Sequence, residues 1–132
     1  MSEENVEVVR NIYDAWTRGE SPASLGLFHP DIEWVNPDGA FEPGTRRGLS
    51  SFDDAFAAMG EAFEWIRIEP RHFLDADDQV VVLATFIARG RGSGVERQNE
   101  DGYVWTVREG QATRFCWFND PVKALRAAGL RK

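Results

Sequence analysis

The stretch FEWIRIEPRHFLDADDQVVVLATFIARG, residues 63–90, gives the strongest indication of the fold class. Its first half, as far as Leu74, is rich in β-branched and aromatic residues and is interrupted by Pro70, a composition that predicts an extended segment. The acidic residues 75–78 predict a turn. The run VVVLATFIA that follows is almost wholly apolar, which is typical of a strand covered on both faces. The stretch therefore predicts two long antiparallel strands.

Helices are predicted on the N-terminal side of these strands. Apolar residues recur at helical spacing from Val6 to Trp16, which indicates an amphipathic helix. Pro22 follows a serine and begins a short second helix. A third helix begins at Ser50, and its apolar residues fall three or four apart on one face: Phe52, Phe56, Met59 and Phe63.

The remaining segments complete an α+β order. The residues HPDIEWVNPDG, 29–39, predict a strand over Ile32–Asn36 that ends at a turn, and three glycines in 37–48 indicate a loop. A last hairpin, Tyr103–Arg108 with Ala112–Phe118, precedes a short terminal helix. We expect one domain, residues 1–132, in which a curved antiparallel sheet wraps around N-terminal helices and forms a cone with an internal pocket.

Composition limits the partners of this domain. The chain has 132 residues and a formal net charge of −7, which argues against binding to nucleic acid or to an anionic membrane surface. Its single cysteine, Cys116, can form no intrachain disulfide. The acidic, amphipathic start does not resemble a signal peptide, and no segment reaches the roughly 18 to 20 apolar residues of a membrane span. We therefore expect a cytoplasmic protein.

Several quoted segments together resemble a known family. They are ENVEVVRNIYDAWTRG (4–19), HPDIEWVNPDG (29–39), the segment 63–94, YVWTVREGQATRF (103–115) and ALRAAGL (124–130). Over nearly the whole chain they look like the SnoaL-like branch of the nuclear-transport-factor-2-like superfamily. The resemblance implies a cone-shaped, cystatin-like α+β roll, a cavity for a small molecule, and commonly a homodimer packed through the outer sheet. It implies no single reaction, because this superfamily includes polyketide cyclases, ketosteroid isomerases, epoxide hydrolases, dehydratases and non-catalytic binders.

The resemblance to ketosteroid isomerases is incomplete at the catalytic positions. Those enzymes carry a general-base aspartate where this chain has Asn36, and an amide takes up no proton at neutral pH. Their second aspartic acid, which donates a hydrogen bond to the developing oxyanion, would fall close to Asp101. Their oxyanion tyrosine would fall near Ile12, with Tyr13 one position away. Most of the isomerase pattern is therefore lost.

The other enzymes of the superfamily also differ from this chain. The aromatic-x-Asn pair of limonene-type epoxide hydrolases is retained as Trp34-x-Asn36, with Trp in place of Tyr. Their Arg-x-Asp would fall within residues 83–86, which are uncharged, and their last aspartate near Trp117. Polyketide cyclases rely on a late-strand acid, and residues 112–118 contain none. The resemblance therefore implies the fold, but this chain lacks the complete set of catalytic residues of any of these enzymes.

Three residues are candidates for catalysis, each with a structural alternative. Asn36 either orients a ligand oxygen from inside the pocket or satisfies the turn ahead of Pro37. Asp38 is either a turn residue or an acid in an apolar mouth, where burial would raise its pKa. Asp101 is either a pocket acid or a solvated residue at a strand entry.

Aromatic residues dominate the predicted ligand-binding set. That set is Trp16, Trp34, Phe56, Met59, Tyr103, Trp105, Cys116 and Phe118. An aromatic cavity suits a flat or polycyclic apolar molecule. Arg46 and Arg47, in the glycine-rich loop, either meet an anionic group of the ligand or are solvated. His29 and His72 have no partner at ligand spacing, so we expect no metal and no cofactor.

Two hypotheses from different classes remain open. The first is an enzyme that isomerises, cyclises or hydrates an apolar small molecule, with Asp101 or Asp38 moving the proton and Asn36 holding the reacting oxygen. The second is a non-catalytic ligand-binding or dimerisation module on the same cone. The sequence alone does not separate them.

Overall fold

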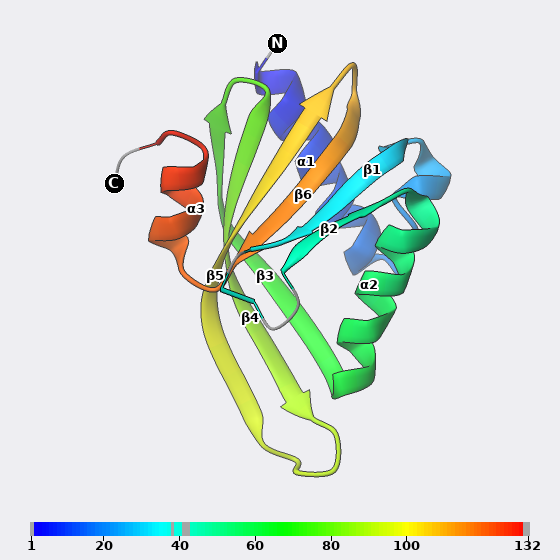
Figure 1. The fold of residues 1–132 in the computed structure, drawn as a ribbon, viewed down its shortest axis with the longest axis vertical. Helices are drawn as coiled ribbons and strands as arrows, with labels where there is room; N and C mark the ends of the chain where they lie inside the picture. Colours follow the sequence, from blue (N-terminus) through cyan, green and yellow to red (C-terminus); the bar gives the residue numbers. More distant parts are fainter. Residues whose placement is uncertain (1, 38, 41–42, 131–132) are drawn as a thin grey trace.

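A computed structural model describes residues 2–37, 39–40 and 43–130. Six strands form one curved sheet in the order β2-β1-β6-β5-β4-β3 (Figure 1). The strands are β1 (Phe28–Asn36), β2 (Gly44–Arg47), β3 (Phe63–Ala76), β4 (Gln79–Gly90), β5 (Glu96–Arg108) and β6 (Gln111–Phe118). The helices are α1 (Ser2–Thr17), the 3-10 turn η1 (Ala23–Leu25), α2 (Leu49–Ala62) and α3 (Pro121–Ala127). The predicted α+β class is confirmed.

The predicted pair of long strands is present as β3 and β4, which run antiparallel from Phe63 opposite Gly90 to Ala76 opposite Gln79. Val80 and Val82 belong to the main core, whereas Val81 packs in a second cluster on the opposite face. All three side chains are fully buried. The apolar run in β4 is therefore covered on both faces, as its composition predicted.

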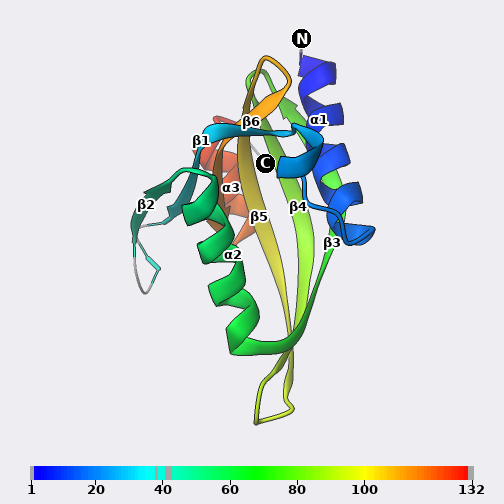
Figure 2. The ribbon, with the colours of Figure 1, turned by 90° about the vertical axis from the view of Figure 1, so that its right-hand side faces the viewer.

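Helices lie on both faces of the sheet (Figure 2). α1 and α2 pack on the concave face, where their apolar residues share the main core with those of β1, β4, β5 and β6. α3 covers part of the outer face, through Ala124 and Leu125. It approaches β5 so closely that a Cβ atom on Gly102 would lie 2.4 Å from the Cβ of Ala124. The glycine therefore sets how closely α3 sits on the sheet.

Three strands differ from the sequence-based expectation. β1 begins at Phe28, before His29 and Pro30, and β5 begins at Glu96, because backbone pairing with β6 and β4 extends both strands through polar residues. The predicted loop contains the short β2, which pairs with the end of β1. The sheet is antiparallel except between β1 and β6, which run parallel. These features depend on pairing partners that no local pattern identifies.

Candidate functional site

A cavity of about 440 Å³ lies between the two N-terminal helices and the concave face of the sheet. This volume is within the range of small-molecule pockets. The cavity is lined by Tyr13, Trp16, Trp34, Phe56, Phe63, Ile68, Phe86, Arg97, Gln98, Asn99, Asp101, Tyr103, Phe115, Trp117 and Asn119. Most of the lining is aromatic, and the polar groups come mainly from β5.

Stacked and tilted rings form the apolar wall. Trp16 of α1 stacks on Phe56 of α2, with ring centroids 5.1 Å apart and planes 13° from parallel. Trp34 of β1 lies against Phe115 of β6, with centroids 4.8 Å apart. Phe56 is 37% exposed although it is a large apolar side chain. The wall therefore offers flat apolar surfaces that a ring system can cover.

Asn36 fixes two of the rings. Its Oδ1 accepts a hydrogen bond from Trp34 Nε1 at 2.8 Å and another from Trp117 Nε1 at 2.7 Å. Both indoles line the cavity, and they come from different strands, β1 and β6. Because its side-chain oxygen accepts both of these hydrogen bonds, Asn36 holds the two indole rings in position in the cavity wall.

Asp101 is the buried carboxyl group of the lining. In β5 it pairs with Ala84 of β4, which belongs to the main core, so the side chain points toward the concave face. It is 9% exposed. Asn99 Nδ2 donates a hydrogen bond to its Oδ1 at 2.5 Å, and the Tyr103 hydroxyl donates to its Oδ2 at 2.9 Å.

Burial is the main influence on the protonation of Asp101. Loss of solvation raises the pKa of this carboxyl, and the nearby charge of Glu100 adds to the rise. The hydrogen bonds from Asn99 and Tyr103 favour the carboxylate and offset part of the effect. The group therefore gains and loses its proton closer to neutral pH than an exposed aspartate does.

Two buried tyrosines flank this acid. Burial raises the pKa of both Tyr13 and Tyr103, which keeps their hydroxyl groups protonated. Tyr13 Oη also accepts a hydrogen bond from Trp105 Nε1 at 3.1 Å. Its own proton thus remains available to an acceptor in the cavity.

Most of the residues singled out from the sequence lie in this lining. Trp16, Trp34, Phe56, Asp101 and Tyr103 all contribute to it. Asn36 supports it through the two indoles.

Other predicted site residues lie elsewhere. Trp105 is fully buried in the core and is not part of the lining. Cys116 and Phe118 also lie outside the lining, because they pair with Val104 and Gly102, whose side-chain positions face the outer side of the sheet. Asp38 and the side chain of Met59 are outside the described residues.

Four polar residues of the lining were not predicted, and one of them, Gln98, lies between Arg97 and Asn99 on β5. Arg97 and Asn99 precede Asp101 at two-residue intervals on β5, and Asn119 follows β6. The same alternation could have identified Arg97 and Asn99, but the strand was expected to begin at Tyr103. Because residues 96–101 are all charged or polar, they show no apolar alternation that would predict a strand.

Among residues 2–37, 39–40 and 43–130, no group of three or more His, Cys, Asp or Glu side chains is arranged to hold a metal ion. Within the same residues, no helix has both the length and the apolar composition needed to span a membrane.

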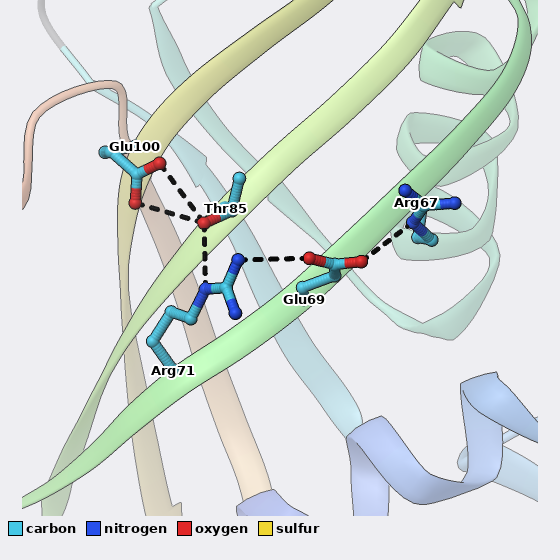
Figure 3. Close-up of polar contacts among 5 residues, drawn as sticks. All are labelled: Arg67, Glu69, Arg71, Thr85 and Glu100. Atoms are coloured by element: carbon cyan, nitrogen blue, oxygen red, sulfur yellow. Dashed lines mark hydrogen bonds and ion pairs between the residues drawn. The ribbon is translucent and has the colours of Figure 1, made fainter.

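A second polar cluster lies on the outer face of the sheet (Figure 3). The Arg71 Nε donates to Thr85 Oγ1 at 3.1 Å, and the Thr85 hydroxyl lies 3.1 Å from both carboxylate oxygens of Glu100. Glu69 forms ion pairs with both Arg71 and Arg67. We call these five residues the outer cluster; it joins β3, β4 and β5 on the face opposite the cavity.

Comparison with protein families identifies the chain. The model of the SnoaL-like domain matches residues 9–115, so the chain belongs to the SnoaL-like family. It therefore has the SnoaL-like fold. Comparison with curated proteins gave no match.

Solved structures share the fold along almost the entire chain. TerC, co-crystallised with polyporic acid, is 27% identical, with coverage of 96% of this chain and 98% of TerC and a TM-score of 0.76. An NTF2-like protein of unknown function from Burkholderia pseudomallei is 26% identical, with coverage of 96% and 97% and a TM-score of 0.77. A protein from Catenulispora acidiphila with a ketosteroid isomerase-like fold, in complex with trimethylamine, is 21% identical, with coverage of 95% and 94% and a TM-score of 0.71.

Proposed function

We propose that this protein binds a flat, largely apolar small molecule in the cavity and that Asp101 exchanges a proton with an oxygen-bearing end of that molecule. The observation that carries the proposal is the buried Asp101 carboxyl, held by Asn99 and Tyr103 in the lining of an aromatic cavity. The co-crystallisation of TerC with polyporic acid supports a small organic ligand for this fold.

The chemistry that the site favours is general acid–base catalysis by one carboxyl group. Asp101 is the one carboxylate among the described lining residues, and no histidine is among them. A single group of this kind can take a proton from one atom of a ligand and return it to another, which is an isomerisation. Protonated Asp101 can also donate a hydrogen bond to a ligand carbonyl, together with the Tyr13 hydroxyl.

Binding without chemistry is the second candidate. It is favoured by the engagement of Asn36, whose oxygen holds two indoles and therefore does not hold a reacting oxygen of the ligand. In that case Asp101 would serve to select ligands that carry a hydrogen-bond acceptor.

We further propose that two copies pair through the outer face of β3, β4 and β5. The outer cluster carries both signs of charge, so a second copy related by a two-fold axis can place acidic groups opposite basic ones. Half-buried Trp65 and Ile87 lie on the same face and would add apolar contact.

The binding test compares 9-fluorenone with fluorene, which has the same shape without the carbonyl oxygen. Three of the five tryptophans line the cavity, so tryptophan fluorescence reports binding. We expect fluorenone to bind about fivefold more tightly, the effect of roughly one hydrogen bond. Asp101→Asn keeps a donor and should keep the preference, whereas Asp101→Leu should abolish it. Failure of both molecules to bind would contradict the proposed function.

A further inference from the structure

The polar side chains of the cavity form a graded series along β5. Arg97, Asn99, Asp101 and Tyr103 line the cavity from alternate positions and therefore share one face of the strand, and the next residue on this face, Trp105, lies in the core. The first two are exposed, whereas Asp101 is 9% exposed, Tyr103 4% and Trp105 0%. The strand thus runs from a charged, open end of the cavity to a closed apolar end.

Arg97 lies at the open end of the cavity and differs from the other lining residues in its charge. It is the one cationic side chain among the described lining residues, in a chain with a net charge of −7. Eight other arginines form ion pairs with acidic side chains: Arg10, Arg18, Arg47, Arg67, Arg71, Arg89, Arg108 and Arg114. The guanidinium of Arg97 makes no hydrogen bond or ion pair within the described part of the chain.

The two loop arginines considered from the sequence do not take this place. Arg47 pairs with Glu33 on the outer face of β1. Arg46 lies opposite Trp34 in the β1–β2 pair and is not among the residues that line the cavity. The cation available to a ligand is therefore Arg97.

We propose that the cavity selects organic anions: flat aromatic molecules that carry a carboxylate or a similar acidic group at one end, which Arg97 binds. This inference rests on the proposed function, since it assigns the orientation of the same ligand. The acidic group lies at the open end, where it keeps part of its hydration, and the rings lie against Trp16, Phe56 and Trp34. The opposite end, with its oxygen, meets Asp101.

The spacing of Arg97 and Asp101 along β5 agrees with this orientation of the ligand. Asp101 follows Arg97 by four positions, so their Cα atoms lie roughly 13 Å apart along β5. The long arginine side chain shortens the distance between the two polar groups, which suits a ligand of roughly two or three rings. A guanidinium also binds a carboxylate with two parallel hydrogen bonds, which fixes the orientation of the ligand.

The test compares 9-fluorenone-2-carboxylate with the neutral 9-fluorenone-2-carboxamide at low and at physiological salt. We expect the wild type to bind the carboxylate about fivefold more tightly than the amide, with a smaller difference at higher salt. Arg97→Gln should lose this preference and bind the carboxylate and the amide equally. Arg97→Lys should retain part of it, because it keeps the charge without the planar fork.

Arg126→Gln is the matched control, since it removes the same charge from the exposed surface of α3. It should bind all three ligands as the wild type does. Equal binding of carboxylate and amide by the wild type, or a preference that persists in Arg97→Gln, would overturn the inference while the proposed function stands. Failure to bind fluorenone itself would reject both.

Discussion

Asp101 owes its properties to side chains two positions away on the same strand. Asn99 and Tyr103 can reach its two oxygens because alternate residues of a strand lie on one face, and the pairing with β4 turns that face toward the cavity. A carboxyl in this position is buried, yet both of its oxygens have donors. The strand thus holds an acid in an apolar cavity without leaving it unpaired.

The raised pKa of Asp101 predicts a pH-dependent stability. The folded chain holds the proton more tightly than the unfolded chain, so the wild type loses stability as pH rises from about 4, the value for unfolded aspartate, through the folded pKa. Asp101→Asn has no such titration. Its free energy of unfolding, relative to the wild type, should increase across this window and become level above it. Urea denaturation at a series of pH values measures this difference.

Asp53→Asn provides the comparison for this measurement, because Asp53 is an exposed aspartate on α2. Its stability is measured over the same pH series, so that the effect of removing an exposed carboxylate is known. A flat difference for Asp101→Asn would show that burial does not govern the protonation of Asp101.

At the scale of elements, α3 is held on the sheet by its first turn and by one close approach. The Asp120 side chain accepts a hydrogen bond from the backbone N–H of Val122 at 2.9 Å and caps the helix, with Pro121 at the first position. Ala124 then lies over Gly102, where no side chain separates helix and strand. The packing of α3 against the outer face of the sheet therefore requires a small residue at position 102 of β5.

Gly102→Ala should displace α3. The added Cβ would lie 2.4 Å from the Ala124 Cβ and 3.2 Å from the Pro121 Cα, so the helix must move. We expect a loss of about 1–3 kcal/mol in the free energy of unfolding, the usual cost of overpacking, measured by urea denaturation.

Gly60→Ala is the matched control for this change. It lies within α2, and a Cβ there would meet no neighbour within 4 Å. This substitution should raise the free energy of unfolding by about 0.5–1 kcal/mol, because alanine favours a helix more than glycine does. Equal stability of Gly102→Ala and the wild type would show that α3 is not seated by this contact.

At the scale of the whole molecule, the two faces of the sheet have different surroundings. α1 and α2 cover the concave face, whereas α3 covers only part of the outer face (Figures 1 and 2). The cavity lies on the concave side. The outer cluster remains on the rest of that face (Figure 3). A surface with both charges and half-buried apolar residues suits pairing with a second copy.

Sedimentation velocity at micromolar concentration should show a dimer. Ile87→Glu should convert it to a monomer, because the two-fold axis would bring buried, unpaired charges into the interface. Leu25→Glu, at an apolar residue that is 48% exposed in η1, should leave the dimer intact. A monomeric wild type under these conditions would contradict the proposed pairing.

The elements with strong local patterns could be predicted from the sequence. The helical spacing in α1, the apolar run of β4 and the turn residues around it predicted the class, and the aromatic content predicted an apolar cavity. β2 and the first half of β5 were missed, because polar residues such as those of Glu96–Asp101 carry no apolar alternation and become a strand only when β4 supplies hydrogen bonds.

The composition of the site depends on how the strands pair, which local sequence does not specify. Strand register places Asp101, Asn99 and Arg97 on the concave face and Cys116 and Phe118 off the cavity lining, since a shift of one residue would reverse the faces. The contact of Asn36 with Trp117 likewise requires the parallel pairing of β1 with β6. Local sequence encodes the period of a strand, but the partner strand fixes which side chains meet in the cavity.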